Sequence, residues 1–400
     1  MSRFDEVLSK KMCLGCGLCE SIGKNEGYKM QLSSNGFYNV VPPDKRNLKF
    51  ENEIENICPS INIYGSGEKS LWGPIKHIYK AHSTDEDIRF QASSGGVITS
   101  ACTHLIKTKQ VDAVMHVGNS NDQYLHNILK ISITKEDILS NSSSRYAPAI
   151  VFSNIVQILE KDNFNYVFVG KPCDILGIKN FLFLYPQYEL RFKLFISIFC
   201  AGMPSYKATE TIINSFNVEL SPKSVRYRGN GWPGEFTVDY GNNIIKKISY
   251  INSWNNYLGR NLHFRCKICP DSIGTIADIS VGDAWETEKG FIDFTDRMGE
   301  SCVITRTDAG DLLIKHLFSE SLIEGSEIGT QQLNLMQPNH IRKRVSSGYK
   351  LLILSLSNPK LFRVRKIKLL YLMSKYNILK GLRDIIGVIK RYNKWIKYDN

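Results

Sequence analysis

The sequence predicts a mixed α/β protein with a small cysteine-rich module in front of the core and a basic helical tail behind it. Three observations support this fold class. Apolar strands alternate with segments of helical spacing through the middle of the chain, cysteines gather near its start, and Lys and Arg dominate the last 60 residues. Alternating strands and helices are typical of layered α/β folds. The 400 residues are enough for two or three domains with a hydrophobic core.

The composition limits the compartment and the partners. The N-terminus, MSRFDEVLSK, has no apolar stretch of a secretory signal, and the longest apolar run, near Leu194 to Met203, is too short to span a bilayer. We therefore expect a cytoplasmic protein whose ten cysteines are reduced thiols or metal ligands. The net charge is +12, but residues from 341 onward carry 16 Lys and Arg against 2 Asp, so the first 340 residues sum to −2. A near-neutral body argues against a nucleic-acid partner.

The first motif is the run CLGCGLC at residues 13–19, in which three cysteines are spaced by two residues with glycines between them. Glycines let the backbone wrap closely round a cluster and point N–H groups at its sulfurs. The only nearby Cys-Pro pair is at residues 58–59. The simplest prediction is one 4Fe–4S cluster in a ferredoxin-type module over residues 1–63. Its ligands would be Cys13, Cys16, Cys19 and Cys58. A zinc knob or unliganded thiols are the alternatives.

A glycine-rich, polar passage at residues 64–80 is predicted to link this module to the main body. The loop Ser93-Ser94-Gly95-Gly96 follows, and residues 97–106 after it have helical spacing. A loop that enters a helix N-terminus exposes N–H groups at the positive end of the helix dipole, which suits a phosphate or pyrophosphate. The alternative is an ordinary helix cap. A strand is predicted at residues 111–117.

Two further apolar strands are predicted, at Tyr166–Val169 and Leu194–Phe199, and each is followed by a turn with a cysteine, Cys173 and Cys200 respectively. Open α/β sheets bind ligands at the carboxyl ends of their strands, so both thiols are expected at the ligand-binding edge. The alternative is that these two thiols are small core side chains.

The segment FRCKICPDSIGTIADISVGDAW, residues 264–285, supplies two more thiols, Cys266 and Cys269, in a tight loop. A strand around Ile276 to Val281 is predicted next; it carries Asp278 and ends in a turn at residues 282–283. Two thiolates are half of a four-ligand set. We therefore predict a second cluster on Cys173, Cys200, Cys266 and Cys269.

Two other features leave their roles open. Cys102 is assigned to packing on the apolar face of its helix, and Cys302 is assigned no role. The loop at residues 226–234 carries Arg226, Arg228 and a tryptophan. It could clamp an anionic substrate or cofactor, or it could be an exposed turn with solvated charges.

Taken together, these motifs resemble the beta-subunit family of coenzyme F420 hydrogenases and dehydrogenases over roughly His82 to Thr305. The matching features are the Ser-Gly-Gly loop before a helix, the triplet Ser144-Arg145-Tyr146, the Gly-x-Pro-Cys turn at residues 170–173 and the Cys-x-x-Cys motif followed by Ala-Asp-Ile-Ser. The resemblance implies an α/β flavoprotein that binds FAD beside a 4Fe–4S cluster and passes electrons to or from a carrier. The predicted fold is then a mixed α/β flavin- and cluster-binding core with a ferredoxin-like module in front.

The resemblance also implies roles for single residues. It places Ser94, Gly95 and Gly96 near the flavin, and together with Ser93 and Asp278 these form the predicted cofactor-binding set. Two further roles are predicted from the chemistry of the side chains themselves. Lys171 is a candidate to stabilise an anionic reduced flavin, and Asp283 is a candidate proton donor or hydrogen-bond acceptor. Either residue could instead be an ordinary turn residue. The turn departs from the family pattern, because the family more often has a small hydroxyl residue and a Gln at the positions of Lys171 and Asp174.

The leading functional hypothesis is an iron–sulfur flavoprotein oxidoreductase. Electrons from a ferredoxin-like donor would pass through two 4Fe–4S clusters to FAD and then to an unidentified organic acceptor. One alternative is a non-catalytic electron-transfer subunit that feeds a partner enzyme. A structural zinc protein would explain the Cys-x-x-Cys loop and not the first motif. Behind the module and the linker, the predicted parts are residues 81–150 with the serine–glycine loop, 151–340 with the cluster and flavin core, and the tail at 341–400.

From Ile378 onward the tail has the pattern of an amphipathic basic helix. Apolar residues fall on one side and Lys and Arg on the other, with Trp395 and Tyr398 suited to a membrane interface. Packing of this helix against the body of the protein is the first alternative, and an acidic partner protein is the second. Because each Lys or Arg near anionic lipid contributes about 1 kcal/mol, we hypothesise peripheral contact with the inner face of the membrane through residues 361–400. The apolar set is Ile378, Leu379, Leu382, Ile385, Ile386, Ile389, Tyr392 and Ile396.

Overall fold

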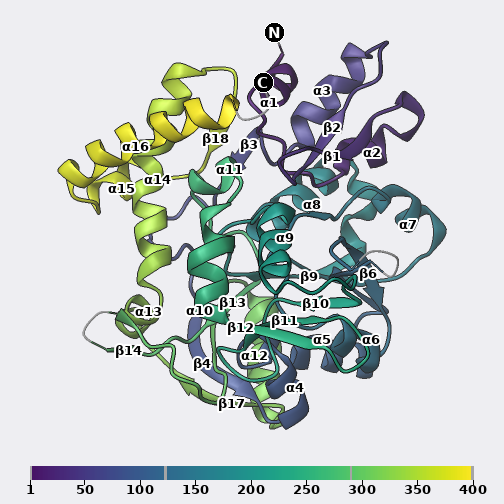
Figure 1. Ribbon diagram of the computed structural model, residues 1–400, viewed down its shortest axis with the longest axis vertical. Coiled ribbons are helices and arrows are strands. Elements are labelled where there is room, and N and C mark those ends of the chain that lie inside the picture. Colours follow the sequence, from purple (N-terminus) through teal and green to yellow (C-terminus); the bar gives the residue numbers. More distant parts are fainter. Residues whose placement is uncertain (1, 121–123, 289–290, 398–400) are drawn as a thin grey trace.

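A computed structural model describes residues 2–120, 124–288 and 291–397, and a large mixed sheet forms the centre of this part of the chain (Figure 1). Within these residues the sheet has nine strands, in the order β17-β4-β16-β13-β9-β8-β5-β6-β7. The strands are β4 (His77–Ser83), β5 (Ala113–Asn119), β6 (Asn127–Ser132), β7 (Ala149–Ile150), β8 (Tyr166–Gly170), β9 (Phe192–Ile198), β13 (Ile279–Asp283), β16 (Ser301–Thr305) and β17 (Ile323–Glu327).

Four neighbouring strands, β13, β9, β8 and β5, run parallel, so their carboxyl ends meet at one edge of the sheet. β16, β4 and β17 extend the sheet as successive antiparallel pairs beside β13. The predicted strands at 111–117, 166–169 and 194–199 are confirmed with shifts of one or two residues at their ends. The turn predicted at residues 282–283 is wrong. Both residues belong to β13, because Gly282 pairs with Cys302 and Asp283 with Ser301.

Helices cover both faces of this sheet. On one face, α5 (Val97–Lys107), α6 (Lys135–Ser140) and α12 (Asp308–Ser319) pack on side chains such as Val114 and Val167. On the other face, α7 (Ile155–Lys161) and α8 (Pro172–Leu184) pack on the alternate side chains of the same strands, such as Met115 and Phe168. Strands buried on both faces have near-continuous apolar sequences, which is why they could be recognised without strict alternation. The predicted mixed α/β class is confirmed.

A smaller three-stranded sheet lies beside the main one and packs on α9 (Tyr206–Ser215). Its strands are β10 (Ser224–Arg226), β11 (Glu235–Asp239) and β12 (Ile245–Ser249). The remaining short elements of the middle region are α4 (Glu86–Gln91), η2 (Pro186–Arg191), α10 (Tyr250–Asn252), η3 (Ser253–Tyr257), η4 (Leu258–Arg260), α11 (Phe264–Lys267), β14 (Thr287–Glu288) and β15 (Phe291–Ile292).

The N-terminal segment, predicted as a separate module, packs on the core through contacts of α2 and α3 with α7 and α8. It comprises α1 (Arg3–Ser9), α2 (Leu18–Ile22), η1 (Lys24–Glu26), β1 (Lys29–Leu32), β2 (Tyr38–Val41), α3 (Leu48–Ile57) and β3 (Asn62–Tyr64). The connection that follows is anchored rather than a free linker, and its last residues already belong to β4. Trp72 is 3% exposed and donates a hydrogen bond to Asn334, and its carbonyl accepts one from Arg306.

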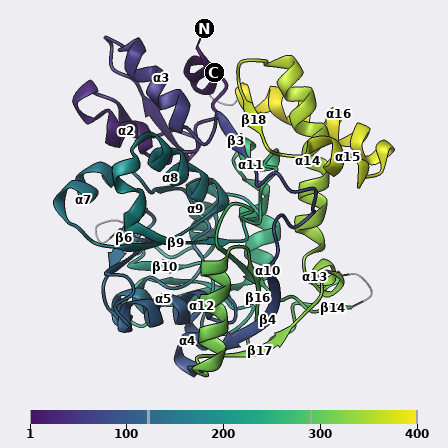
Figure 2. The ribbon, with the colours of Figure 1, turned by 180° about the vertical axis from the view of Figure 1, so that it is seen from behind.

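The C-terminal segment returns to the N-terminal one, and both views show them side by side at the same end of the molecule (Figure 1, Figure 2). Parallel pairing of β18 with β3 joins the two. The segment comprises α13 (Thr330–Met336), α14 (Pro338–Ser357), β18 (Arg363–Arg365), α15 (Leu369–Ser374) and α16 (Ile378–Ile396). In the described part of the chain, no helix combines the length and apolarity that crossing a bilayer requires.

The helix predicted from Ile378 is confirmed as α16, but its two halves differ in their surroundings. In the second half, Val388 and Tyr392 are buried in a cluster with residues of the N-terminal segment. Trp395 is not at an outer surface as predicted, because it stacks on Phe264 and donates a hydrogen bond to the carbonyl of Lys11. The second half of α16 therefore packs against the body of the protein, which was the first alternative to membrane contact. The predicted interfacial residue Tyr398 lies outside the described residues.

Candidate functional site

A cavity of about 240 Å³ lies at the carboxyl ends of the four parallel strands. Its walls include Val117 from β5, Gly170 from β8, Ile198 from β9 and Val281 from β13. The loop before α5 and the loop at residues 141–147 complete the walls. This edge is where open α/β sheets bind their ligands, so the cavity is the first candidate for a cofactor or substrate site.

The loop before α5 presents a helix N-terminus to this cavity. Ser93, Ser94 and Gly96 all line it. Gly96 caps the helix with φ of +80°, a left-handed conformation that glycine adopts without strain. The Ser93 hydroxyl accepts a hydrogen bond of 2.6 Å from the N–H of Ser144, which ties the loop to its neighbour across the cavity. The first N–H groups of a helix have no partner inside it, so they are free for an anionic ligand.

Two residues of the predicted cofactor-binding set do not line the cavity. A side chain at Gly95 would come within 2.6 Å of the Ala81 carbonyl and 2.7 Å of the Ser301 N–H, so glycine is needed here for packing against β4 and β16. Asp278 lies before the opposite end of β13, where its carboxylate accepts hydrogen bonds from the N–H of Phe195 and from Thr307. Both assignments are therefore corrected to structural roles.

The turn after β8 separates the cavity from the second cysteine group. Lys171 and Asp174 line the cavity, whereas Cys173 lines a neighbouring smaller one. The Lys171 ammonium donates a hydrogen bond of 2.7 Å to Asp174. Burial opposes the charge on Lys171, but Asp174 and the nearby thiols of Cys173 and Cys200 raise its pKa overall. Lys171 therefore remains a cation at the wall of the cavity.

Asp283 lines the cavity, but its oxygens already accept hydrogen bonds from neighbouring side chains. It accepts hydrogen bonds of 2.9 and 2.7 Å from the Arg228 guanidinium and one of 2.8 Å from the Trp232 indole. Arg228 is 1% exposed, so the loop at 226–234 is not an exposed turn. A carboxylate held by three donors suits a clamp, and the geometry does not favour the predicted role as proton donor.

The structure brings the four thiols of the predicted core group to one small cavity. They come from the start of α8, the turn after β9, α11 and the loop that follows it. Lys343 from α14 and Arg265 from α11 line the same cavity. Burial raises the pKa of both Cys200, to about 11, and Cys266, while the Lys343 cation acts in the opposite direction on each. Four thiols beside two cations suit a group that carries negative charge on its sulfurs.

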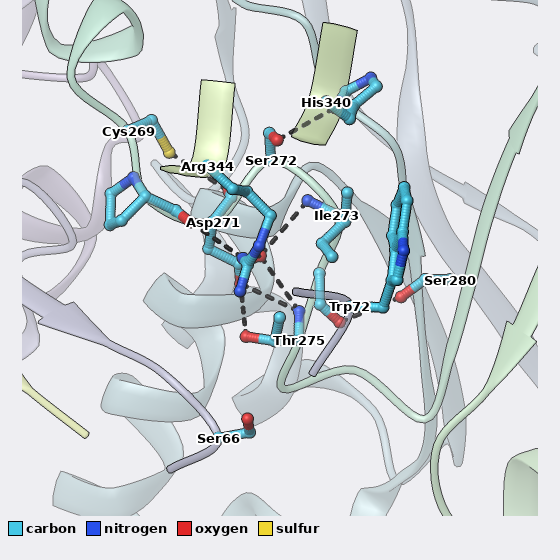
Figure 3. A network of polar contacts seen from close by, with 12 residues as sticks. Ser66, Trp72, Cys269, Asp271, Ser272, Ile273, Thr275, Ser280, His340 and Arg344 are labelled. Atoms are coloured by element: carbon cyan, nitrogen blue, oxygen red, sulfur yellow. Dashed lines mark hydrogen bonds and ion pairs between the residues drawn. The ribbon is translucent and has the colours of Figure 1, made fainter. Parts of the chain in front are cut away.

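The loop after Cys269 is held by a network centred on Asp271 (Figure 3). The Asp271 carboxylate accepts hydrogen bonds from the N–H and hydroxyl of Thr275, each of 3.0 Å, and lies 3.4 Å from the Arg344 guanidinium. On the same helix, α14, His340 contacts the hydroxyl of Ser272 at 3.0 Å. The C-terminal segment therefore fixes the loop that carries one of the four thiols.

The four thiols of the predicted front group also lie close enough to influence one another. The pKa of Cys16 is raised by burial and then by Cys58 and Cys13, and the pKa of Cys19 is raised by burial and by the same group. The glycines of the motif are required, because both have positive φ and a side chain at Gly17 would come within 2.7 Å of the Ser153 N–H. Among the described residues, no group of three or more His, Cys, Asp or Glu is placed to hold a single metal ion.

The two cysteine groups adjoin. Leu14 and Pro59, the chain neighbours of two front cysteines, line the cavity of the core group. Burial raises the pKa of Cys58 in the front group and of Cys266 in the core group, and the Arg265 cation acts in the opposite direction on both, so it lies near both. Front group, core group and strand-edge cavity therefore follow one another through the protein.

Several residues around these sites could not be found from the sequence. Arg265 lies inside the segment at residues 264–285 but was given no role, and the only sequence signal for Lys343 was its place in the basic tail. In the cavity wall, Ser142, Ser143 and His116 were not singled out, and Arg145 was noted only as part of a triplet. The remaining cysteines, Cys102 and Cys302, are buried, and burial raises the pKa of each to about 12. Cys102 also lines the strand-edge cavity, whereas Cys302 does not.

Comparisons with known proteins agree with these features. Residues 78–156 match the family model for the N-terminal part of the coenzyme F420 hydrogenase/dehydrogenase beta subunit, and residues 164–331 match the model for its C-terminal part. The chain is 26% identical over 269 residues to the coenzyme F420 hydrogenase subunit beta of Methanothermobacter thermautotrophicus, which covers 64% of this chain and 86% of the relative. The corresponding protein of Methanococcus voltae is 22% identical over 68% of this chain and 92% of its own length.

Two further likenesses differ in extent. A coenzyme F420-dependent sulfite reductase of Methanocaldococcus jannaschii is 19% identical over 77% of this chain, which spans 46% of that larger protein. Among solved structures, a chain of the F420-reducing NiFe hydrogenase complex of Methanosarcina barkeri superposes with a TM-score of 0.57 at 20% identity, covering 73% of this chain and 97% of that one. The structural likeness shows the shared fold.

Proposed function

The chain belongs to the coenzyme F420 hydrogenase/dehydrogenase beta-subunit family, and on this premise we propose that it is an iron–sulfur flavoprotein oxidoreductase. Two 4Fe–4S clusters would be held by the front and core cysteine groups, and FAD by the strand-edge cavity. Electrons would pass from a ferredoxin-like donor through both groups to the flavin and on to an organic acceptor. The reduced thiols that this requires are typical of the cytoplasm, where we place the protein.

The observation that carries this proposal is the turn at residues 170–174. Lys171 and Asp174 line the strand-edge cavity, and Cys173, which lies between them in the sequence, lines the cavity of the core thiols. A ligand in one cavity would therefore lie one turn of chain away from a group bound in the other. Such adjacency is what electron transfer between a cluster and a flavin requires.

The side chains around the two cavities have separate parts in this function. Bound clusters supply one-electron transfer and a bound flavin supplies two-electron chemistry. Lys171, kept charged by Asp174, provides a cation that stabilises negative charge developing on a ring in the cavity. Asp283 fixes Arg228 in the cavity wall and also accepts a hydrogen bond from the Trp232 indole, so its part is positioning. Arg265 and Lys343 offset the negative charge of the thiolates.

A second candidate function is an electron-transfer subunit that serves a partner enzyme. It is favoured by the relatives, because two of them are named as hydrogenase subunits and the solved relative is part of a complex. Turnover of an artificial two-electron acceptor by the isolated chain distinguishes the two. Reduction of the acceptor without any partner supports the enzyme, and flavin reduction without turnover supports the electron-transfer role.

The first prediction tests the clusters and the flavin together. Wild-type protein purified without oxygen is expected to contain roughly eight iron atoms per chain and one flavin. Cys16→Ala should remove about half of the iron, because it takes one ligand from the front group only, and should leave the flavin bound. Iron assay and absorption spectra measure both quantities.

Matched controls are the buried cysteines outside both groups. Cys302→Ala removes a thiol from the core and should leave the iron content unchanged. Colourless wild-type protein that contains zinc, or equal iron in the wild type and the Cys16 variant, would contradict the proposed function.

A further inference from the structure

We propose that the loop at residues 142–145 is a binding subsite for a phosphate group, and that it holds the diphosphate of the flavin cofactor against the N-terminus of α5. The proposal rests on the proposed function and names the part of the ligand that this side of the cavity recognises. It concerns Ser142, Ser143 and Arg145, all of which line the cavity.

The first supporting observation is a set of polar atoms without partners. The hydroxyls of Ser142 and Ser143 and the Nε of Arg145 are buried and, among the described residues, have no hydrogen-bond partner. Ser142 is 9% exposed. Buried polar groups are normally satisfied, and leaving one unpaired costs about 1–3 kcal/mol. Three such atoms lie in one loop whose residues line the cavity, and a polar ligand bound there would complete them.

The backbone of the same loop is strained. Ser143 has φ of +93°, a region that side chains other than glycine rarely adopt. A residue held in this way costs about 1–3 kcal/mol, and such positions cluster at ligand-binding sites because the surrounding structure has to enforce them. The loop is therefore held in a conformation that its own sequence does not favour.

The charges around the cavity leave one cation uncompensated. Lys171 is paired with Asp174, and Arg228 is paired with Asp283, each at 2.7 Å. Arg145 contacts no carboxylate among the described residues, and its Nη1 donates one long hydrogen bond of 3.3 Å to a backbone carbonyl. Burial lowers the pKa of Arg145 to about 10. The cavity is therefore poised for one anionic group.

The N-terminus of α5 lies across the cavity from this loop and adds the second half of an anion site. Its first residues, Val97, Ile98 and Thr99, line the cavity together with the capping Gly96. The hydrogen bond from the Ser144 N–H to Ser93 joins the two loops. N–H groups of a first turn, a guanidinium and two hydroxyls form a donor set for phosphate oxygens.

The experiment compares two flavins that differ in their phosphates. Full-length protein freed of flavin is titrated with FAD and with riboflavin, which has the same ring and no phosphate. Arg145→Met should weaken FAD binding by roughly 10-fold to 100-fold and leave riboflavin binding unchanged, because only charge-assisted hydrogen bonds to phosphate are lost. Arg145→Lys, which keeps the charge, should retain part of the affinity. Exposed Arg260→Met has the same change in net charge and should match the wild type.

The possible outcomes separate the subsite from the function. Equal loss of FAD and riboflavin in the Arg145 variants, or equal affinity of the wild type for both flavins, would overturn the subsite while leaving the flavoprotein intact. A wild type that binds neither flavin would overturn the proposed function itself. Inorganic pyrophosphate that binds FAD-loaded wild type and not FAD-loaded Arg145→Met would assign the same anion subsite to a substrate.

A different observation carries a second inference, which concerns the exposed half of α16. We infer that this half docks on an anionic membrane surface. At 3.6 residues per turn, five aliphatic side chains fall within an arc of about 100°. All are 37–69% exposed, so the packing of the second half of α16 on the body leaves them uncovered. They are Ile378, Leu379, Leu382, Ile386 and Ile389.

The positive charge beside the exposed apolar face of α16 favours an anionic membrane as its binding partner. Lys and Arg side chains fill the adjoining arc of the helix, and the one carboxylate of α16, Asp384, accepts a hydrogen bond from the Tyr376 hydroxyl. Protein interfaces are depleted in Lys and enriched in aromatic residues, whereas this face combines Lys with aliphatic side chains. That composition is typical of helices that lie in a lipid headgroup region.

The test uses point substitutions in the full-length chain. Removal of the whole tail would strip Tyr392 from Phe264, two residues before Cys266, and so would damage the core thiol group. Vesicles with one third phosphatidylglycerol in phosphatidylcholine should sediment the wild type at low salt, and less of it at moderate salt. Leu379→Glu with Ile386→Glu should abolish most of the binding.

The matched control is Phe183→Glu with Leu190→Glu, two exposed residues of another surface with the same change in charge. It should sediment as the wild type does. Wild type that ignores the anionic vesicles, equal sedimentation with pure phosphatidylcholine, or unchanged sedimentation of the α16 variant would each overturn the inference.

Discussion

Cys266→Ala is expected to remove the iron of the core cysteine group and to disconnect the flavin from the front group. The thiol is 8% exposed and shares its cavity with Cys173, Cys200 and Cys269, so its loss leaves three of the four proposed thiolate ligands. Iron content should fall from roughly eight to roughly four atoms per chain. Reduction of the flavin by an external one-electron donor should slow sharply, because the path from the front group is interrupted. Stopped-flow absorbance of the flavin measures this rate.

Comparison with the front group makes the result specific. Cys16→Ala should leave the core iron in place, and Cys302→Ala should lose only packing, about 1 kcal/mol or less of the free energy of unfolding. The Cys266 side chain also packs beside Phe37 and Met203, so its thermal stability is measured in parallel. Unchanged iron content in a folded Cys266 variant would remove this thiol from the ligand set.

The sequence predicted those parts of the molecule that depend on local pattern. Buried strands such as β8 and β9 are short apolar runs ended by turns, and their boundaries were correct within two residues. Cys173 and Cys200 each follow a predicted buried strand. Because parallel strands end at the same edge of a sheet, this position alone predicted that the two thiols lie at one edge. The glycine spacing of the first motif predicted a backbone wrapped round a cluster, and the close approach that the structure has at Gly17 is instead to the backbone of Ser153.

The parts that could not be predicted depend on contacts between distant segments. Gly95 was assigned to a ligand because the serine–glycine loop enters a helix N-terminus and resembles the family motif, but a side chain at Gly95 would meet the backbones of β4 and β16. Asp283 was assigned as a proton donor or hydrogen-bond acceptor for a cofactor, since nothing near it in the sequence indicates its ion pair with Arg228, 55 residues away. Lys343 reaches the carbonyl of Cys200 from α14, and no local pattern marks a basic tail residue as a neighbour of thiols.

The buried ion pair between Arg228 and Asp283 is expected to contribute strongly to stability. Asp283→Ala is expected to lower the free energy of unfolding by about 3–5 kcal/mol, because it leaves a buried cation without its partner. The Arg228 side chain is 2% exposed and that of Asp283 is 20% exposed. The same substitution removes the acceptor of the Trp232 indole, so a second buried donor loses its hydrogen bond. Urea unfolding followed by circular dichroism measures the change.

A double variant separates the loss of a contact from the cost of an unpaired charge. Arg228→Met with Asp283→Ala should be more stable than Asp283→Ala alone, because it removes the cation that the single substitution strands in the interior. Glu235→Ala breaks an exposed pair with Lys247, whose side chains are 50% and 54% exposed, and should change the free energy of unfolding by about 1 kcal/mol or less. An Asp283 variant as stable as the Glu235 variant would mean that water reaches Arg228 and that the clamp does not hold the mouth of the cavity.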